Sequence, residues 1–293
     1  MTVKTFPIVA FLALLLGGIA IGFAGIFMRL SDVNPVASAF WRMALAAPLF
    51  WGWAFAVRKQ DKANGKRTGM SGVLLLTGLC FACDLGLWHM SLHYTTVANA
   101  TLLSNLAPIV IAVWMWIAYR TRFAGIFIIG MVSALAGAFL LIGPNAAIGG
   151  DKLLGDGLGL STALFYAAYQ LAVKSARNHY STARLMAWST TVTGLTLLPF
   201  ALAMEGAFFP ATTWGWWPLL GLAVICQIGG QAVIAYALAH LTAALSSVSL
   251  LIQPLTAAIA AWIIFHEVIS PIQMLGGLML ILGIYLSKRG SQD

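Results

Sequence analysis

The chain has 293 residues, of which 61% are apolar and only 8% are charged, and its formal net charge is +8. Soluble domains average about 45–50% apolar and about 25% charged residues, so this composition excludes a soluble fold. The chain instead contains repeated apolar runs of about 20 residues, the length that an α-helix needs to cross a hydrocarbon core of about 30 Å.

In chain order, these runs predict ten transmembrane helices. Charged or turn-rich breaks separate most of them, and the connections at 94–96 and 240–242 are the shortest. Backbone groups in lipid must be satisfied within the span, and the runs are about twice as long as barrel strands, so we expect helices. The predicted spans are 8–29, 36–57, 71–93, 97–118, 124–142, 157–176, 184–204, 215–239, 243–265 and 271–287.

Basic residues are distributed unequally between the two ends of these spans. Of the sixteen Lys and Arg residues, the side that holds the N-terminus receives Lys4, Arg58, Lys59, Lys62, Lys66, Arg67, Arg120, Arg122, Lys174, Arg177, Arg184, Lys288 and Arg289. The opposite side receives Arg29 and Lys152, and Arg42 is left over inside the second span. The positive-inside rule therefore predicts a cytoplasmic (inner) membrane protein with both termini in the cytoplasm. The charge needs no nucleic-acid partner, because no basic stretch is interleaved with aromatic residues.

The sequence also repeats internally. Residues 97–140 align without gaps with residues 243–286, which brings a Trp pair, a Pro pair and two Gly pairs into register. Five helices separate equivalent positions, and an odd number inverts the second copy relative to the first. We therefore predict two inverted five-helix repeats, 1–145 and 146–293, around a central cavity, as in secondary transporters.

Two segments carry a family resemblance: PVASAFWRMALAAPLF in the second span, and SLHYTTVANATLLSNLAPIVIAVWMWI across the end of the third and the fourth. Together with the two halves, they resemble the drug/metabolite transporter superfamily, specifically its EamA-like exporters. The chain is most similar to the small exporters of amino acids, including the aromatic-amino-acid type. The resemblance implies that the first, third, fourth, sixth, eighth and ninth spans surround the cavity, that the fifth and tenth are peripheral, and that a small metabolite is exported.

Asp84 is the one acidic residue clearly within a predicted span, and it shares a helical stripe with Trp88 and Ser91. An intramembrane carboxylate is a candidate functional group by default. It could hold a substrate ammonium group, or take up a proton that couples transport to the proton gradient; a structural ion pair with Arg42 is the alternative. Trp88 would supply a flat wall with cation–π attraction for an amine.

Other polar side chains follow helical stripes in the fourth, sixth, eighth and ninth spans. Amides and hydroxyls of this kind suit recognition of a zwitterion, although a hydroxyl can equally bond the carbonyl one turn back. We expect Pro108 and Pro254 to kink their helices, either as hinges or as packing adjustments. The further candidates for substrate binding are Thr101, Asn105, Tyr166, Tyr169, Gln170, Gln227, Gln231, Ser246, Ser249 and Gln253.

Glycines form a separate pattern in the first and tenth spans. We predict that they are surfaces for close helix packing, and those of the fifth and tenth spans could alternatively form a dimer contact. These residues are Gly17, Gly18, Gly22, Gly276, Gly277 and Gly283.

Two other functions compete with metabolite export. An exporter of cationic or aromatic drugs would also use aromatic residues with one acid. An intramembrane enzyme would need a catalytic constellation, and the sequence contains no H-E-x-x-H, G-x-S-x-G or P-loop motif. We therefore expect no enzymatic activity, no metal and no cofactor, and as partners a small-molecule substrate, membrane lipid and, for coupling, protons. The residues leave the exact substrate, the coupling ion, the transport direction and the oligomeric state open.

Overall fold

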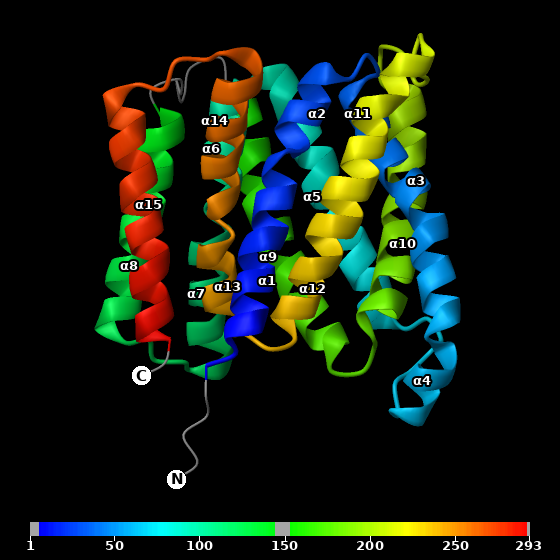
Figure 1. Cartoon of the computed structure of the whole chain (residues 1–293), viewed down its shortest axis with the longest axis horizontal. Helices are drawn as coiled ribbons and strands as arrows, with labels where there is room; N and C mark the ends of the chain where they lie inside the picture. The colour runs from blue at the N-terminus through cyan, green and yellow to red at the C-terminus, as the bar shows by residue number, and fades with distance from the viewer. Residues whose placement is uncertain (1–5, 144–152, 292–293) are drawn as a thin grey trace.

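The computed structural model of the chain describes residues 6–143 and 153–291. Within these residues helices are the sole regular secondary structure, and they stand side by side as a bundle (Figure 1). The first part of the chain forms α1 (Ile8–Gly22), α2 (Ala24–Leu30), α3 (Pro35–Ala56), α4 (Arg58–Ala63), α5 (Gly72–Tyr94), α6 (Val97–Ser104), α7 (Ala107–Tyr119) and α8 (Gly125–Ile142). The second part forms α9 (Leu153–Arg177), α10 (Thr182–Ala203), η3 (Thr213–Gly215), α11 (Trp216–Gly221), the π-helical η4 (Leu222–Ala232), α12 (Val233–Leu238), α13 (Ala243–Ser249), α14 (Ile252–Phe265) and α15 (Pro271–Gly290).

Eight helical segments are long and apolar enough to cross a membrane. Each of the ten predicted segments coincides with one helix or with consecutive helices, and all but two of them coincide with these eight. The exceptions, α3 and α9, have sufficient length at 22 and 25 residues, but Arg42 in α3 and Asp156 and Lys174 in α9 make them less apolar. The chain is thus an all-helical membrane protein, and the crossing of the bilayer by α3 and α9 stays a prediction.

The two aligned spans are each broken in the middle. The first consists of α6 and α7, and the second of α13 and α14. Thr96 and Thr242, 146 positions apart, cap the N-termini of α6 and α13 with their side chains. At the other ends, Arg120 and His266, also 146 positions apart, adopt the left-handed conformation that terminates α7 and α14. The register found in the sequence therefore matches the local geometry at both ends of the broken helices.

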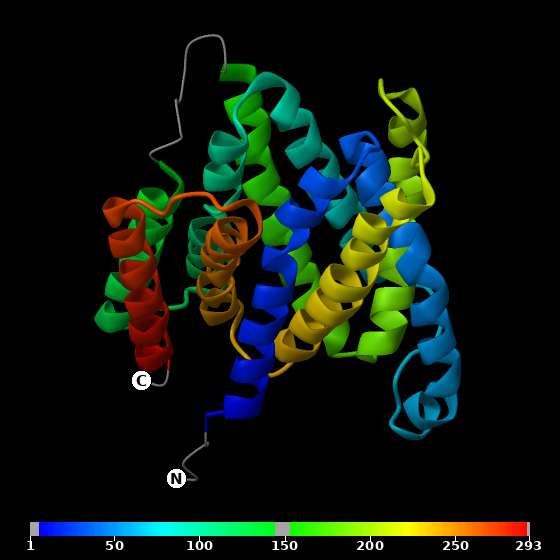
Figure 2. The ribbon, with the colours of Figure 1, turned by 45° about the horizontal axis from the view of Figure 1, so that its top comes forward.

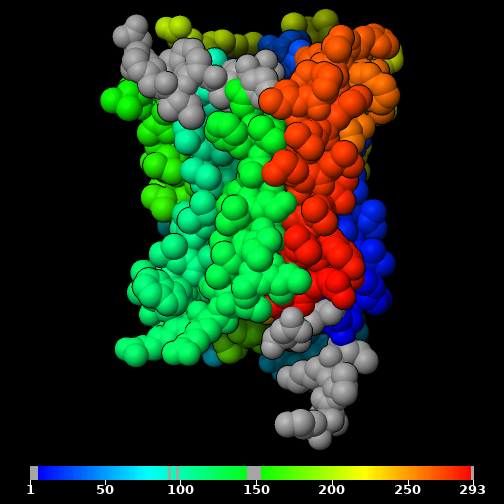
Figure 3. All heavy atoms as spheres, turned by 90° about the vertical axis from the view of Figure 1, so that its left-hand side faces the viewer, coloured from blue at the N-terminus to red at the C-terminus, as the bar shows by residue number. Residues whose placement is uncertain are grey.

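α8 and α15 pack along each other at one edge of the bundle, where they lie side by side in green and red (Figures 1 and 3). Their glycines allow backbone contact: a Cβ on Gly137 would lie 2.4 Å from the backbone nitrogen of Leu280, and one on Gly283 would lie 2.3 Å from that of Ala134. Since higher numbers on α8 meet lower numbers on α15, the two helices are antiparallel. These glycines face each other within one chain, as the packing prediction requires.

α1 occupies the middle of the second half of the chain, between α14 and the η4–α12 segment (Figure 2). A Cβ on Gly17 would lie 2.8 Å from Ile234 Cγ1, and one on Gly22 would lie 2.6 Å from Thr256 Cβ. The prediction that these glycines are packing surfaces is confirmed. On the far side of the bundle, α9 packs along α5 and α6, and α10 packs along α3.

Candidate functional site

The two helix breaks frame a small polar pocket inside the bundle. Its volume is about 10 Å³, which is room for roughly one water molecule. The break in α6–α7 contributes Asn105 and Pro108, α9 contributes Tyr166 and Gln170, and α14 contributes Gln253. The remaining lining residues are Ser104, Ala107, Ser247, Leu250 and Leu251.

The amides of this pocket differ in how their hydrogen bonds are satisfied. Gln253 Nε2 donates to the Tyr166 hydroxyl at 3.2 Å, and Asn105 Nδ2 donates to the Thr101 carbonyl at 2.8 Å. Gln170 is fully buried, and neither atom of its amide has a partner among the described residues. Leaving such a group unpaired costs about 1–3 kcal/mol. The pocket therefore suits a polar occupant that can both accept and donate a hydrogen bond.

A buried cation lies in the bundle outside the lining of this pocket. Arg42 is 6% exposed, and its Nε donates to Gln227 Oε1 at 2.9 Å. Gln227 in turn donates from Nε2 to Thr190 Oγ1 at 3.2 Å. This chain of hydrogen bonds links α3, η4 and α10, and it holds the guanidinium in a fixed place within the bundle.

Aromatic rings connect Arg42 to the pocket. Its guanidinium carbon lies 5.7 Å from the centroid of the Phe81 ring, and Phe81 stacks on Tyr169 with a centroid separation of 4.5 Å. Tyr169 is followed at 6.3 Å by Tyr166, which receives the hydrogen bond from Gln253. A series of pairwise contacts thus links Arg42 on α3, through rings on α5 and α9, to Gln253 on α14.

Asp84 belongs to the same region. Its side chain is 8% exposed on α5, and it interacts electrostatically with Arg42. No described residue donates a hydrogen bond to this carboxylate or forms an ion pair with it; the one ion pair among the described residues joins Arg29 to Glu267. A structural ion pair with Arg42 is therefore not formed. Neither side chain lines the pocket, but one buried region of the bundle holds both a carboxylate and a guanidinium.

The other predicted site residues are not all in one place. Tyr169 and Gln231 are both buried, and the side-chain oxygen of Gln231 has no hydrogen-bond partner among the described residues. The Ser246 hydroxyl donates to the Thr242 carbonyl within its own helix, as the structural alternative for hydroxyls anticipates. The Ser249 hydroxyl is buried and has no hydrogen-bond partner within the described part of the chain, and Trp88 is half-buried against His89; neither residue lines the pocket.

The two prolines follow helix breaks, whereas the sequence analysis predicted kinks in continuous helices. Pro108 is in the first turn of α7 and lines the pocket, and Pro254 is buried in the first turn of α14. Short hydrogen-bonded turns bridge the breaks, with Leu106 N donating to Leu103 O and Leu251 N donating to Val248 O. The lack of an N–H group on proline favours a new helix start at these points.

Sequence reasoning did not name Ser247, and it considered Arg42 only as a structural ion-pair partner of Asp84. Ser247 lines the pocket together with Tyr166 and Gln170 of α9, whereas Ser246 and Ser249 do not line it. Among the basic residues, Arg42 is the one assigned to neither side of the membrane, because it lies inside the second predicted span. Its position inside a span was the available signal, since intramembrane charges mark functional sites.

Replacing Tyr166 by phenylalanine should lower the free energy of unfolding by about 0.5–1.5 kcal/mol, because the Gln253 amide loses its partly buried acceptor. Thermal unfolding of the purified protein in detergent measures the loss. The matched control is Tyr285→Phe, which removes a hydroxyl from a side chain that is 52% exposed. Equal unfolding midpoints for the two variants would show that the Tyr166–Gln253 hydrogen bond contributes nothing.

Comparison with known proteins identifies the family to which this chain belongs. The model of the EamA-like transporter family matches the chain twice, at residues 8–143 and 153–289. An uncharacterized transporter of Archaeoglobus fulgidus is 28% identical over 98% of both chains, and a probable terminal-alkyne amino-acid exporter of Streptantibioticus cattleyicolor is 25% identical over 77% of this chain and 76% of its own. A crystal structure with 12% sequence identity shares the fold, with a TM-score of 0.80 over 97% of this chain and 99% of that chain. The chain therefore belongs to the EamA-like transporter family, and it is a multi-pass membrane transporter, not an enzyme.

Proposed function

We propose that this protein is a secondary transporter that exports amino acids or related small metabolites across the cytoplasmic membrane by alternating access. The observation that carries the proposal is the pair of opposite charges in one buried region. Asp84 would hold a substrate ammonium group and Arg42 a substrate carboxylate, while Gln170, Gln253 and Asn105 supply neutral hydrogen bonds. The relative named as an amino-acid exporter supports the same substrate class.

The architecture that we propose has ten membrane-spanning helices in two inverted repeats, 1–145 and 146–293. Three observations support it: the family model matches once in each half, the caps of the broken helices recur 146 positions apart, and the equivalent helices α8 and α15 are antiparallel. In this arrangement α3 and α9 also cross the bilayer. The basic loops then place both termini in the cytoplasm.

The size of the central pocket supports alternating access. At about 10 Å³ it is far too small for an amino acid, so substrate entry requires the helices around it to move apart. The breaks before Pro108 and Pro254 lie at its wall or next to it, where a change in a few backbone angles would open one side. We assign the hinge role to these two prolines.

Export of cationic or aromatic drugs is the second candidate function. Phe81, Tyr166 and Tyr169 together with Asp84 would suit a flat cation. Arg42 opposes it, because its positive charge faces the same region and would repel a second cation. A zwitterion satisfies both charges, so we favour it.

Flux of three matched compounds into proteoliposomes separates the two functions. Phenylalanine is a zwitterion, phenylalaninamide keeps only the ammonium group, and 3-phenylpropionate keeps only the carboxylate. We expect counterflow of the radiolabelled zwitterion and little exchange of the other two. Flux of phenylalaninamide without phenylalanine or any other amino acid of a panel would favour drug export, and the same assay with and without a pH gradient tests proton coupling.

A further inference from the structure

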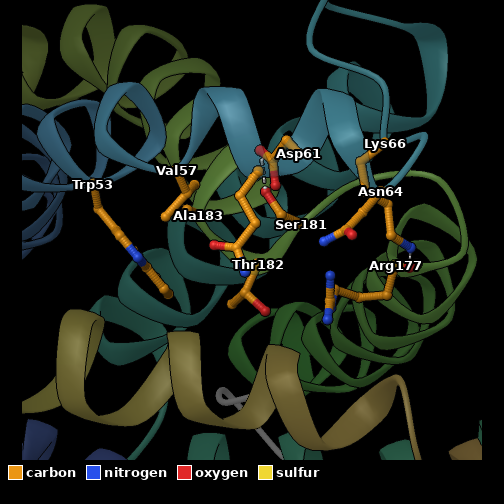
Figure 4. A pocket seen from close by; sticks show the side chains of 10 residues that line it. Trp53, Val57, Asp61, Asn64, Lys66, Arg177, Ser181, Thr182 and Ala183 are labelled. Carbon is orange, nitrogen blue, oxygen red and sulfur yellow. Dashed lines mark hydrogen bonds between the residues drawn. The ribbon is translucent and has the colours of Figure 1, made fainter.

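At the end of the bundle where α1 begins and α15 ends, α4 follows α3 (Figure 1). A second and larger pocket is lined by residues of this segment and of the turn that joins α9 to α10 (Figure 4). Its volume is about 270 Å³. It opens between the α4 segment, which follows α3, and the turn that joins α9 to α10. Its lining residues are Trp53, Val57, Gln60, Asp61, Asn64, Lys66, Arg177, Ser181, Thr182 and Ala183. None of these belongs to the central site.

The walls of this pocket are fixed by hydrogen bonds between the two segments. The Ser181 hydroxyl donates to Asp61 Oδ2 at 2.8 Å, and Lys66 Nζ donates to the Asn178 carbonyl at 3.2 Å. The backbone nitrogen of Arg67 donates to the His179 carbonyl at 2.9 Å. The 58–67 segment is therefore held against the α9–α10 turn, and the pocket between them is a built feature of the fold.

The charges in the pocket favour an anion. Lys66 and Arg177 bring two cations, and the one acid, Asp61, is 5% exposed and already accepts the hydrogen bond from Ser181. Arg177 Nε is buried and has no hydrogen-bond partner among the described residues. Thr182 and Ala183 open the first turn of α10, where backbone N–H groups attract negative charge.

The position of the pocket relative to the membrane indicates which kind of molecule contains this anionic group. Thr182 begins a candidate membrane span, so the pocket lies at the boundary between lipid and water. Figure 4 shows Trp53 on the side of the pocket opposite Arg177 and Asn64, and this tryptophan is 43% exposed. Exposed tryptophans of this kind sit at the level of lipid headgroups. One wall is thus apolar and the other cationic, as an amphiphile requires.

We propose that this pocket binds a phosphate ester, supplied by the headgroup of an anionic phospholipid. Its phosphate lies between Lys66 and Arg177, Asn64 and Thr182 donate further hydrogen bonds, and the glycerol backbone leaves the pocket past Trp53. Two basic side chains close to a phosphate bind it far more tightly than the same charges on an open surface.

Native mass spectrometry of the purified full-length protein in detergent tests this site with three probes. These are dioctanoyl phosphatidylglycerol, dioctanoylglycerol, which lacks the phosphate, and glycerol 3-phosphate, which lacks the acyl chains. We expect the phospholipid alone to bind. Lys66→Gln combined with Arg177→Gln should weaken its binding about tenfold or more.

The control is Arg58→Gln combined with Lys59→Gln, which removes the same charge from two exposed residues of the same segment outside the pocket. This control should bind the phospholipid as the wild type does. Asn64→Asp serves as a second test variant, since no described hydrogen bond depends on its side chain, and its added negative charge should also weaken binding while the unfolding midpoint stays unchanged.

Equal weakening in the control and in the pocket variants, or normal binding by Asn64→Asp, would overturn the proposal. Binding of glycerol 3-phosphate as tight as that of the phospholipid would support the phosphate site and overturn its assignment to lipid. Because the assay measures lipid binding and no flux, its result does not depend on the transport substrate.

Discussion

Replacing Asp84 by asparagine should reduce amino-acid flux about ten- to hundred-fold, since a hydrogen bond to a charged group contributes about 1.5–3 kcal/mol and each 1.4 kcal/mol is a factor of ten. The substitution keeps the size of the side chain and removes the charge that we assign to the substrate ammonium. No described residue loses a hydrogen bond or an ion pair, so the unfolding midpoint should not fall. Counterflow in proteoliposomes and thermal unfolding measure the two effects.

Asp32→Asn is the matched control for this variant. Asp32 is exposed near the end of α2, and its carboxylate accepts a hydrogen bond from the backbone nitrogen of Ala211. Asparagine retains an oxygen at this position, so flux should stay normal. Normal flux with normal pH dependence in Asp84→Asn itself would remove Asp84 from both substrate binding and proton coupling.

The partner charge provides a second readout of the same hypothesis. Arg42→Gln should reduce the flux of the same zwitterion. Arg42→Lys should retain part of this flux, because lysine keeps the positive charge but not the geometry of the hydrogen bond from Nε to Gln227. The two variants should differ in which compound is affected. In Asp84→Asn, the flux of 3-phenylpropionate relative to phenylalanine should rise, because the variant no longer distinguishes a compound without an ammonium group. In Arg42→Gln, the flux of phenylalaninamide relative to phenylalanine should rise, because the variant no longer distinguishes a compound without a carboxylate. A uniform loss for every compound in both variants would indicate a structural role for the pair.

The extent of each helix could be predicted from the sequence because length and composition decide it. Every predicted span coincides with helical structure, and the register of 146 positions recurs in the caps at Thr96 and Thr242. These are local properties: an apolar run of sufficient length must be helical in lipid, and a capping threonine acts within one turn.

The breaks and the π-helical segment depend on tertiary packing and could not be predicted in this way. A proline in the sequence is compatible with a kink or with a new helix start. In the folded chain Pro108 lies in the first turn of α7, so it marks a new helix start. Nothing in the residues of η4 distinguishes it from an α-helix; its glycine Gly230 meets α1 at Gly17 in a backbone contact that only the folded chain contains.

The sequence predicted which types of residue form the candidate site better than it predicted how they are arranged in space. Helical spacing placed Gln170 with Tyr166, because a stripe on one helix is a local property, and Asp84 stood out as the one acidic residue within a predicted span. The hydrogen bond between Arg42 and Gln227 joins residues that are 185 positions apart. The pocket lined by Lys66 and Arg177 likewise depends on two loops from different parts of the chain. Such contacts leave no periodic signal in a single sequence.

Alanine at Gly137 should destabilise the protein, by about 1–3 kcal/mol for an overpacked contact. A Cβ there would lie 2.4 Å from Leu280 N and 2.5 Å from Gly276 O, and both are backbone atoms that cannot turn away. The helices α8 and α15 must therefore separate. The effect has to exceed the gain of roughly 1 kcal/mol that alanine normally brings to a helix interior, so a lower unfolding midpoint is a strong sign of the contact.

Gly125→Ala is the control on the same helix, because no atom lies within 4 Å of a Cβ built there. Its midpoint should equal or slightly exceed that of the wild type. Blue-native electrophoresis then separates packing within the chain from the dimer contact that glycine-rich helices could also form: Gly137→Ala should lower the midpoint without changing the native mass. Equal midpoints for the two variants, or a loss of stability that appears only together with a change of native mass, would contradict the packing of α8 against α15 within one chain.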